Sequence, residues 1–260
     1  MVARGSQTPR KVLITGAAGL IGTVLMRGLG DRYELSAVDR ALRRPPNIRR
    51  RNLARPGSLS SLLEGADAVV DLAGIADDRA AWRAIWKNNL PATMNVLEAA
   101  REAGVRRYVF ASSNHVTGMY ERDPPYSAIV AGDYAGLDAG SIPLIGPRTP
   151  IRPDGAYALG KLLGEAAARW YADAFDLSPI CLRIGTVNAA NRPGKPRDFA
   201  TLLTHADLLR LVGCALEARA DLGFRVYYGV SRNTWRFWEI EDAADEIGYH
   251  PQDDAEAFRA

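Results

Sequence analysis

Tyr157 and Lys161 are two side chains whose types and spacing could do chemistry together. They lie in the stretch DGAYALGKLLGE (154–165), which is typical of an amphipathic helix. Residues four positions apart share one face of a helix, so the phenol and the ammonium can point toward one cleft. A tyrosine titrates near pH ~10, and a nearby cation favours the phenolate, which is a useful general base. The alternative is a packed tyrosine beside a surface lysine, because this spacing is common by chance.

A second polar cluster follows the strand-like run RYVFASS (107–113). The polar side chains at its carboxyl end are Ser112, Ser113, Asn114 and His115. In open parallel sheets, ligands bind beyond the carboxyl ends of the strands. A serine hydroxyl there could hydrogen-bond both a reacting oxygen and the Tyr157 oxygen. The structural alternative is capping of the strand end by serine and asparagine.

A glycine-rich turn follows the first strand-like run, with Gly16, Gly19 and Gly22 at three-residue spacing. A backbone without Cβ atoms lets amide groups approach a pyrophosphate at the positive end of the next helix. Asp39 ends the second strand-like run, where an acidic side chain can hold an adenosine ribose. The joint spacing predicts a dinucleotide-binding site. The alternatives are tight packing at the glycines and a capping role for Asp39, and neither explains why the glycines and the aspartate occur together at this spacing.

NAD is the expected cofactor, because the Asp39 carboxylate would repel a 2′-phosphate. The adjacent Arg40 and the arginines after it could attract one, so NADP stays open as the minor alternative. Further cofactor contacts are expected from the glycine turn and from the segments after the second and third strands. They are Leu20, Ile21, Asn52, Leu53, Leu72, Ala73 and Gly74.

Six short runs rich in β-branched and aromatic residues alternate with helix-like segments along the chain. The expected strands are 11–16, 33–39, 68–74, 107–113, 179–185 and 224–230. The expected helices lie near 20–30, 58–65, 80–103, 155–174 and 205–218. Near-continuous apolar strands between helices indicate a parallel sheet covered on both faces, and right-handed crossovers make it a doubly wound α/β (Rossmann) fold.

The chain length favours one domain, because an α/β chain of 260 residues often remains undivided. We expect residues 1–10 to be a flexible tail and 11–260 a single Rossmann-type domain. Residues 186–204 and 231–260 are expected to form a small C-terminal elaboration on the substrate side. The Gly- and Pro-rich segment 123–153 lacks a clear period and is longer than most connections, so we expect a long loop near the active site.

Composition limits the possible partners. The hydrophobic fraction of 47% is ordinary for a soluble protein, and no apolar run is long enough to span a membrane. Seven arginines gather in 40–56, but no nucleic-acid motif accompanies them, so a solvated loop is expected. The start of the chain lacks a secretory signal and only two cysteines are present, which favours the cytoplasm. No Cys/His cluster has metal-ligand spacing, so we expect no metal, nucleic-acid or membrane partner.

Together, TGxxGxxG, the strand-end serine and YxxxK resemble the extended short-chain dehydrogenase/reductases, the NAD-dependent epimerase/dehydratase family. The resemblance spans nearly the whole chain. It implies that Tyr157 is the base, that Lys161 binds the nicotinamide ribose and tunes Tyr157, and that Ser113 is the hydrogen-bonding partner. It also implies that Asn89, in NNLPATMNVLEAA (88–100), braces the site and contributes to cofactor binding.

Within that family the chain is most similar to the uronate dehydrogenases. The similar segments are FASSNH, RPDGAYALGK, LRIG, RDFATLLTHADL, VYYGVS and PQDDAEAF, in order and approximate spacing. The resemblance implies that Arg197, eight residues before His205, contacts the acid group of a sugar acid, a role that suits a planar guanidinium. It also implies that Ser113, Asn114 and His115 contact sugar hydroxyls, although His115 could equally be a buried, hydrogen-bonded residue.

Two positions depart from the pattern of that subfamily. Leu20 and Ala76 stand where that subfamily commonly has a glutamine and a serine, so two polar substrate contacts are lost. The resemblance implies an NAD-dependent dehydrogenase, commonly a homo-oligomer, that oxidises a sugar or uronic acid at the anomeric hydroxyl to a lactone. The alternatives are a nucleotide-sugar epimerase or dehydratase with no net redox change, and a cofactor-binding protein without catalysis.

Overall fold

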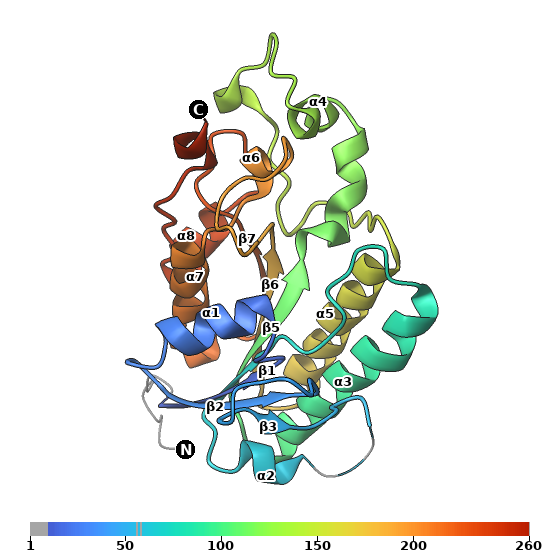
Figure 1. Ribbon diagram of the computed structural model, residues 1–260, viewed down its shortest axis with the longest axis vertical. Coiled ribbons are helices and arrows are strands. Elements are labelled where there is room, and N and C mark those ends of the chain that lie inside the picture. The colour runs from blue at the N-terminus through green and yellow to red at the C-terminus, as the bar shows by residue number, and fades with distance from the viewer. Residues whose placement is uncertain (1–9, 56, 58, 260) are drawn as a thin grey trace.

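A seven-stranded parallel sheet forms the centre of the computed structural model, which describes residues 10–55, 57 and 59–259 (Figure 1). Its strand order is β3-β2-β1-β4-β5-β6-β7, so the chain moves outward from β1 first to one edge and then to the other. The strands are β1 (Lys11–Thr15), β2 (Glu34–Asp39), β3 (Arg49–Arg50), β4 (Ala68–Asp71), β5 (Arg107–Ser113), β6 (Ser178–Ile184) and β7 (Arg225–Gly229). This topology confirms the predicted doubly wound fold.

Helices cover both faces of the sheet because its strands are apolar on both sides. Side chains alternate across a strand, so Val12 and Ile14 of β1 join one core and Leu13 joins the other. The first core is closed by α1 (Leu20–Gly28), α7 (His205–Glu217) and α8 (Glu241–Ile247). The second is closed by α2 (Ser60–Leu63), α3 (Trp82–Glu102) and α5 (Ala156–Ala174). Figure 1 shows α1 and α7 on one side of the strands, with α3 and α5 on the other.

A third apolar cluster forms a lobe beyond the carboxyl ends of the strands, at the top of Figure 1. It includes Ile129 of α4 (Tyr126–Ala131), Ala200 of α6 (Asp198–Thr201), and Trp238. The backbone of Ile145 forms an isolated parallel bridge with Trp238, and the Ile145 amide donates to Phe237 O at 2.7 Å. The segment 123–153 is therefore packed against the region after β7.

The sequence did not predict the helical turns inside 123–153. The helix α4 has six residues and a 3₁₀ turn covers Ala139–Ser141. Helices this short cannot display a clear 3.6-residue pattern, so they were missed. The sequence analysis also missed β3 and α8, because elements this short carry too few residues for a clear pattern. The tail predicted for residues 1–10 falls almost entirely outside the described residues.

Candidate active site

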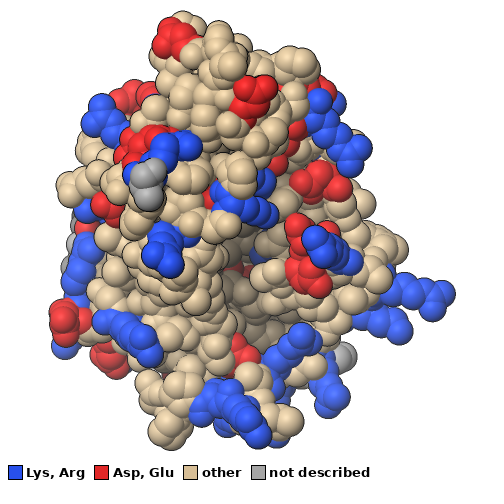
Figure 2. All heavy atoms as spheres, turned by 45° about the horizontal axis from the view of Figure 1, so that its top comes forward, with Lys and Arg blue, Asp and Glu red and all other residues tan. Residues whose placement is uncertain are grey.

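A cavity of about 800 Å³ opens at the carboxyl ends of the strands, where a doubly wound sheet places its ligands. Figure 2 shows this hollow on the face turned forward. Its lining comes from the β1–α1 turn, from the ends of β2, β4, β5 and β6, and from the first turns of α5. All of the predicted site residues line it except Asn89.

The glycine turn has no space for side chains. Gly16 has a positive φ of 63°, and a Cβ atom there would lie 2.8 Å from the Leu72 carbonyl oxygen. A Cβ atom at Gly22 would lie 2.6 Å from the Ala17 Cα. Gly19 caps the start of α1, whose first turn carries no acidic residue that would repel an anion. The backbone of this turn therefore fits a pyrophosphate at the positive end of α1.

The carboxylate of Asp39 is held in place at one end of the cavity. Its Oδ2 atom accepts a hydrogen bond from the Ala18 amide at 3.0 Å, and its Oδ1 atom accepts one from the Ala41 amide at 2.7 Å. These two bonds fix an acidic group beside the glycine turn, at the position that an adenosine ribose requires. The residues present thus fit NAD.

Asn89 lies behind the cofactor wall rather than in it. Its Oδ1 atom accepts from the Ile75 amide at 2.8 Å, and its Nδ2 atom donates to the Ile75 carbonyl at 3.0 Å. A Cβ atom at Gly74 would lie 3.2 Å from the Asn89 side chain. The predicted bracing role agrees with this geometry. The predicted contact with the cofactor stays a prediction, and both polar atoms of the amide hold the backbone after β4.

Two glycines bring α5 close enough to the sheet to bury Lys161. A Cβ atom at Gly160 would lie 2.4 Å from Ile85 of α3, and one at Gly164 would lie 2.4 Å from the Phe110 ring of β5. The Lys161 side chain is buried between these elements, and its Nζ atom donates to the Ala111 carbonyl at 2.5 Å. The tertiary packing thus turns an ordinary YxxxK spacing into a fixed cation under the cavity.

Burial controls the titration of the pair in this geometry. It raises the pKa of Tyr157 to about 12, although the hydrogen bond with Ser113 acts in the opposite direction. It also lowers the pKa of Lys161 to about 8, although the Asp71 carboxylate opposes the shift. We expected the Lys161 cation to lower the pKa of Tyr157. That effect stays a prediction: desolvation of the phenolate is the largest influence on its pKa, and the ammonium lies 5.8 Å from the centre of the tyrosine ring.

His115 is paired with a residue that the sequence analysis did not single out. Its Nδ1 atom lies 2.6 Å from Oδ2 of Asp154, the residue two positions before α5. The imidazole meets the Tyr157 ring edge-on, with 6.0 Å between the ring centres. Asp154 precedes Tyr157 by three residues, but no local pattern signals its contact with the end of β5.

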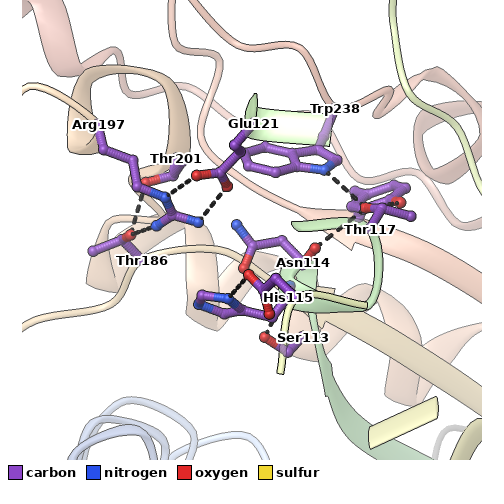
Figure 3. Close-up of polar contacts among 11 residues, drawn as sticks. Ser113, Asn114, His115, Thr117, Glu121, Thr186, Arg197, Thr201 and Trp238 are labelled. Carbon is purple, nitrogen blue, oxygen red and sulfur yellow. Dashed lines mark hydrogen bonds and ion pairs between the residues drawn. The ribbon is translucent and has the colours of Figure 1, made fainter. Parts of the chain in front are cut away.

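Arg197 lines the cavity, but its guanidinium already holds a carboxylate (Figure 3). Its Nε and Nη2 atoms each donate to Glu121 at 2.6 Å, and its Nη1 atom donates to Thr186 Oγ1 at 3.2 Å. Burial acts to lower the pKa of Arg197, but the Glu121 contacts outweigh it and the pKa is raised. The predicted contact of Arg197 with a substrate acid group stays a prediction, and the sequence analysis missed Glu121, which binds this lining residue.

A buried ion pair lies one helical turn beyond Lys161. Glu165 of α5 accepts from the Nε and Nη2 atoms of Arg183 on β6, at 2.9 Å each. Ser112 donates to the same carboxylate at 2.5 Å, and Arg183 Nη1 donates to the Tyr228 hydroxyl at 3.1 Å. This network ties α5 to three neighbouring strands directly below the site. It therefore fixes the position of the helix that carries Tyr157.

Cavities that join a dinucleotide cradle to a phenol and a buried ammonium define the NAD(P)-dependent oxidoreductases of the Rossmann class. A model of the NAD dependent epimerase/dehydratase family matches residues 12–245. The uronate dehydrogenase of Pseudomonas syringae pv. tomato is 32% identical, covering 99% of this chain and 88% of its own. The NAD-dependent glucose-6-phosphate dehydrogenase of Haloferax volcanii is 30% identical over 95% of each chain.

A solved structure of a uronate dehydrogenase variant from Agrobacterium tumefaciens, complexed with NAD, has a TM-score of 0.80 and 31% identity. The match covers 96% of this chain and 87% of that one. The chain belongs to the NAD-dependent epimerase/dehydratase family. The predicted family, fold, enzyme class and cofactor are confirmed: the protein is an NAD-dependent oxidoreductase.

Other expectations stay predictions, among them the homo-oligomer and the cytoplasmic location. In the described part of the chain, no helix is long and apolar enough to cross a membrane. No group of three or more His, Cys, Asp or Glu side chains within that same part could hold a metal ion.

Proposed function

We propose that the protein oxidises a sugar at its anomeric hydroxyl to a lactone, with NAD as the oxidant and Tyr157 as the base. One observation carries the proposal: a single cavity contains both the glycine turn and the set Ser113, Tyr157 and Lys161. The two relatives described above, a uronate dehydrogenase and a glucose-6-phosphate dehydrogenase, are named for oxidations of sugars. The family resemblance supports the same reaction class.

The reaction removes a proton and a hydride from the anomeric centre. Tyr157 accepts the hydroxyl proton, and the C–H electron pair leaves as hydride, for which bound NAD supplies the acceptor. Ser113 hydrogen-bonds Tyr157 and orients the reacting oxygen. Lys161 holds its position through the Ala111 carbonyl and contributes positive charge below the cavity. Asn114 and His115 line the same end of the cavity and contact sugar hydroxyls.

The raised pKa of Tyr157 predicts how oxidation responds to pH. The phenolate is the form that accepts a proton, and burial holds the pKa of the phenol at about 12. A positive charge beside the phenol, such as that of an oxidised nicotinamide ring, shifts the balance toward the phenolate. The oxidation rate should therefore rise with pH across the neutral range, and the reverse reduction should fall.

The test is an assay of the purified protein with NAD and a panel of aldoses, uronic acids and sugar phosphates. We expect reduced-nicotinamide absorbance, and a product that hydroxylamine traps as a hydroxamate, as it does a lactone. Tyr157→Phe should lower kcat by roughly 10²- to 10⁴-fold, the usual contribution of a positioned base. The matched control is Tyr171→Phe on the same helix, because that hydroxyl binds Glu98 at 2.7 Å away from the cavity.

The proposal would be contradicted by turnover of a nucleotide sugar without any change in nicotinamide absorbance, which is the behaviour of an epimerase. An equal rate for Tyr157→Phe and the unaltered protein would contradict the role of the base.

A further inference from the structure

We propose that Glu121 makes this enzyme selective for uncharged aldoses, by occupying the guanidinium of Arg197, which lines the substrate end of the cavity. The inference rests on the proposed sugar oxidation and specifies its substrate class. It excludes uronic acids and sugar phosphates as the preferred substrates.

The Arg197–Glu121 pair is a complete carboxylate-binding interaction made within the protein. Two parallel N–H···O bonds of 2.6 Å join Nε and Nη2 to the two oxygens of Glu121, which is the bidentate geometry a substrate carboxylate would need. The remaining Nη1 donates to Thr186. The Arg197 side chain is 16% exposed and the Glu121 side chain is 15% exposed. A sugar acid would have to displace a shielded ionic pair to reach this arginine.

The segment around Glu121 is anchored, so the carboxylate is held near the cavity. Glu121 lies in the 3₁₀ segment Asn114–Arg122 that directly follows β5. Thr117 of this segment is fully buried, and its hydroxyl lies 2.8 Å from the Tyr228 hydroxyl. The Trp238 indole also donates to Thr117, at 3.4 Å. These contacts tie the segment to β7 and to the third apolar cluster, as Figure 3 shows for Thr117 and Trp238.

The other charged groups at this end of the cavity also disfavour an anion. Asp77 and Asp78 line it, and the Asp78 charge acts on Tyr157 in the direction that keeps the phenol protonated. Among the described lining residues of this end, the Lys and Arg side chains are Lys161 and Arg197. Lys161 binds the Ala111 carbonyl and Arg197 binds Glu121. A second carboxylate placed beside Glu121 would meet like charge, which opposes binding.

A hydrogen-bond donor suited to a neutral hydroxyl is present instead. Asn114 lines the cavity and is 2% exposed, and its Nδ2 atom has no hydrogen-bond partner within the protein. A buried amide without a partner is costly, and a sugar hydroxyl oxygen would satisfy it. This end thus offers a neutral donor to a sugar hydroxyl, while Lys161 and Arg197 are already bound to other groups.

The experiment compares sugars that differ only in charge. The full-length protein is assayed with NAD on D-galactose and D-galacturonate, and on D-glucose, D-glucuronate and D-glucose 6-phosphate. We expect kcat/KM to be at least about tenfold higher for each aldose than for its charged counterpart, because like charges oppose the anion. Glu121→Gln removes the charge and retains the side-chain shape. It should move the uronate-to-aldose ratio of kcat/KM toward the uronate by about tenfold or more.

Glu98→Gln is the matched control. Glu98 also binds an arginine through two bonds, to Arg101 at 2.6 and 3.0 Å, but it lies on α3 away from the cavity. The Glu98→Gln protein should have the same uronate-to-aldose ratio of kcat/KM as the unaltered protein. Thermal unfolding of each variant separates a loss of fold from a change in selectivity.

The outcomes distinguish this inference from the proposed function. If the unaltered enzyme oxidises the charged sugars as efficiently as the aldoses, the selectivity role of Glu121 is overturned while sugar oxidation stands. The same holds if a folded Glu121→Gln protein keeps the original ratio. If no sugar reduces NAD, the proposed function fails and the selectivity proposal falls with it.

Discussion

The imidazole of His115 is held by the carboxylate of Asp154, with 2.6 Å between Nδ1 and Oδ2. The backbone repeats the connection, because the Asp154 amide donates to the His115 carbonyl at 3.4 Å. A Cβ atom at Gly118 would lie 2.0 Å from Asp154 Oδ2, so the glycine leaves the space that the carboxylate occupies. The pair joins the end of β5 to the start of α5 and fixes the ring that faces Tyr157.

Asp154→Asn should lower kcat/KM for the sugar by roughly tenfold or more, because a displacement of about 1 Å within a catalytic site can cost up to about 10²-fold in rate. Gly118→Ala should act in the same direction by displacing Asp154. The control is Gly140→Ala, where the new Cβ would meet Asp138 Oδ1 at an ordinary 3.6 Å. Steady-state assays of the three variants and the unaltered protein measure kcat/KM for the sugar. Equal kcat/KM for Asp154→Asn and the unaltered protein would show that the pair is only structural.

Lys161 should make the stability of the fold depend on pH. Its folded-state pKa of about 8 lies below the ordinary value of 10.5, so between pH 8 and 10 the unfolded chain binds a proton that the folded chain has lost. The free energy of unfolding, relative to that of Lys161→Met, should therefore rise with pH in this window. The slope is at most about 1.4 kcal/mol per pH unit. Urea denaturation at several pH values measures it, and parallel curves for the two proteins would refute it.

Arg183→Met should destabilise the fold strongly. It leaves the buried Glu165 carboxylate without its ion-pair partner, and breaking a buried pair costs about 3–5 kcal/mol. The control is Arg169→Met, which removes an exposed pair with Asp173 on the same helix. Its free energy of unfolding should stay close to that of the unaltered protein. Denaturant titration compares the two, and similar losses would contradict the structural role of the buried network.

Asp39 should decide the preference for NAD over NADP. Asp39→Asn removes the charge that repels a 2′-phosphate, and the neighbouring cavity of about 510 Å³ is lined by Arg40, Arg50, Arg51, Asn52 and Arg55. We expect the NADP-to-NAD ratio of kcat/KM to rise by roughly tenfold. The control is Asp67→Asn, because that carboxylate also accepts two backbone amides, at 2.9 and 2.8 Å, but lies outside the cavity. An unchanged ratio in Asp39→Asn would place the discrimination elsewhere.

The sequence by itself determined the features that depend on neighbouring residues. Apolar runs of strand length alternating with helical patterns predicted the sheet, since each pattern reflects burial of a local face. The spacing of Gly16, Gly19 and Gly22 predicted the dinucleotide turn, because only a local backbone without Cβ atoms can make it. The spacing of Tyr157 and Lys161 placed both groups on one helical face for the same local reason.

Only the tertiary structure decided how these groups behave. Glu121 binds Arg197 from 76 residues away, and His115 meets Asp154 across 39 residues, so no local pattern could signal either contact. The raised pKa of Tyr157 likewise comes from burial, which arises when α5 packs on β5 and α3. Desolvation and ion pairing act through space, so the partner of Arg197 and the pKa of Tyr157 are set by the fold and not by spacing along the chain.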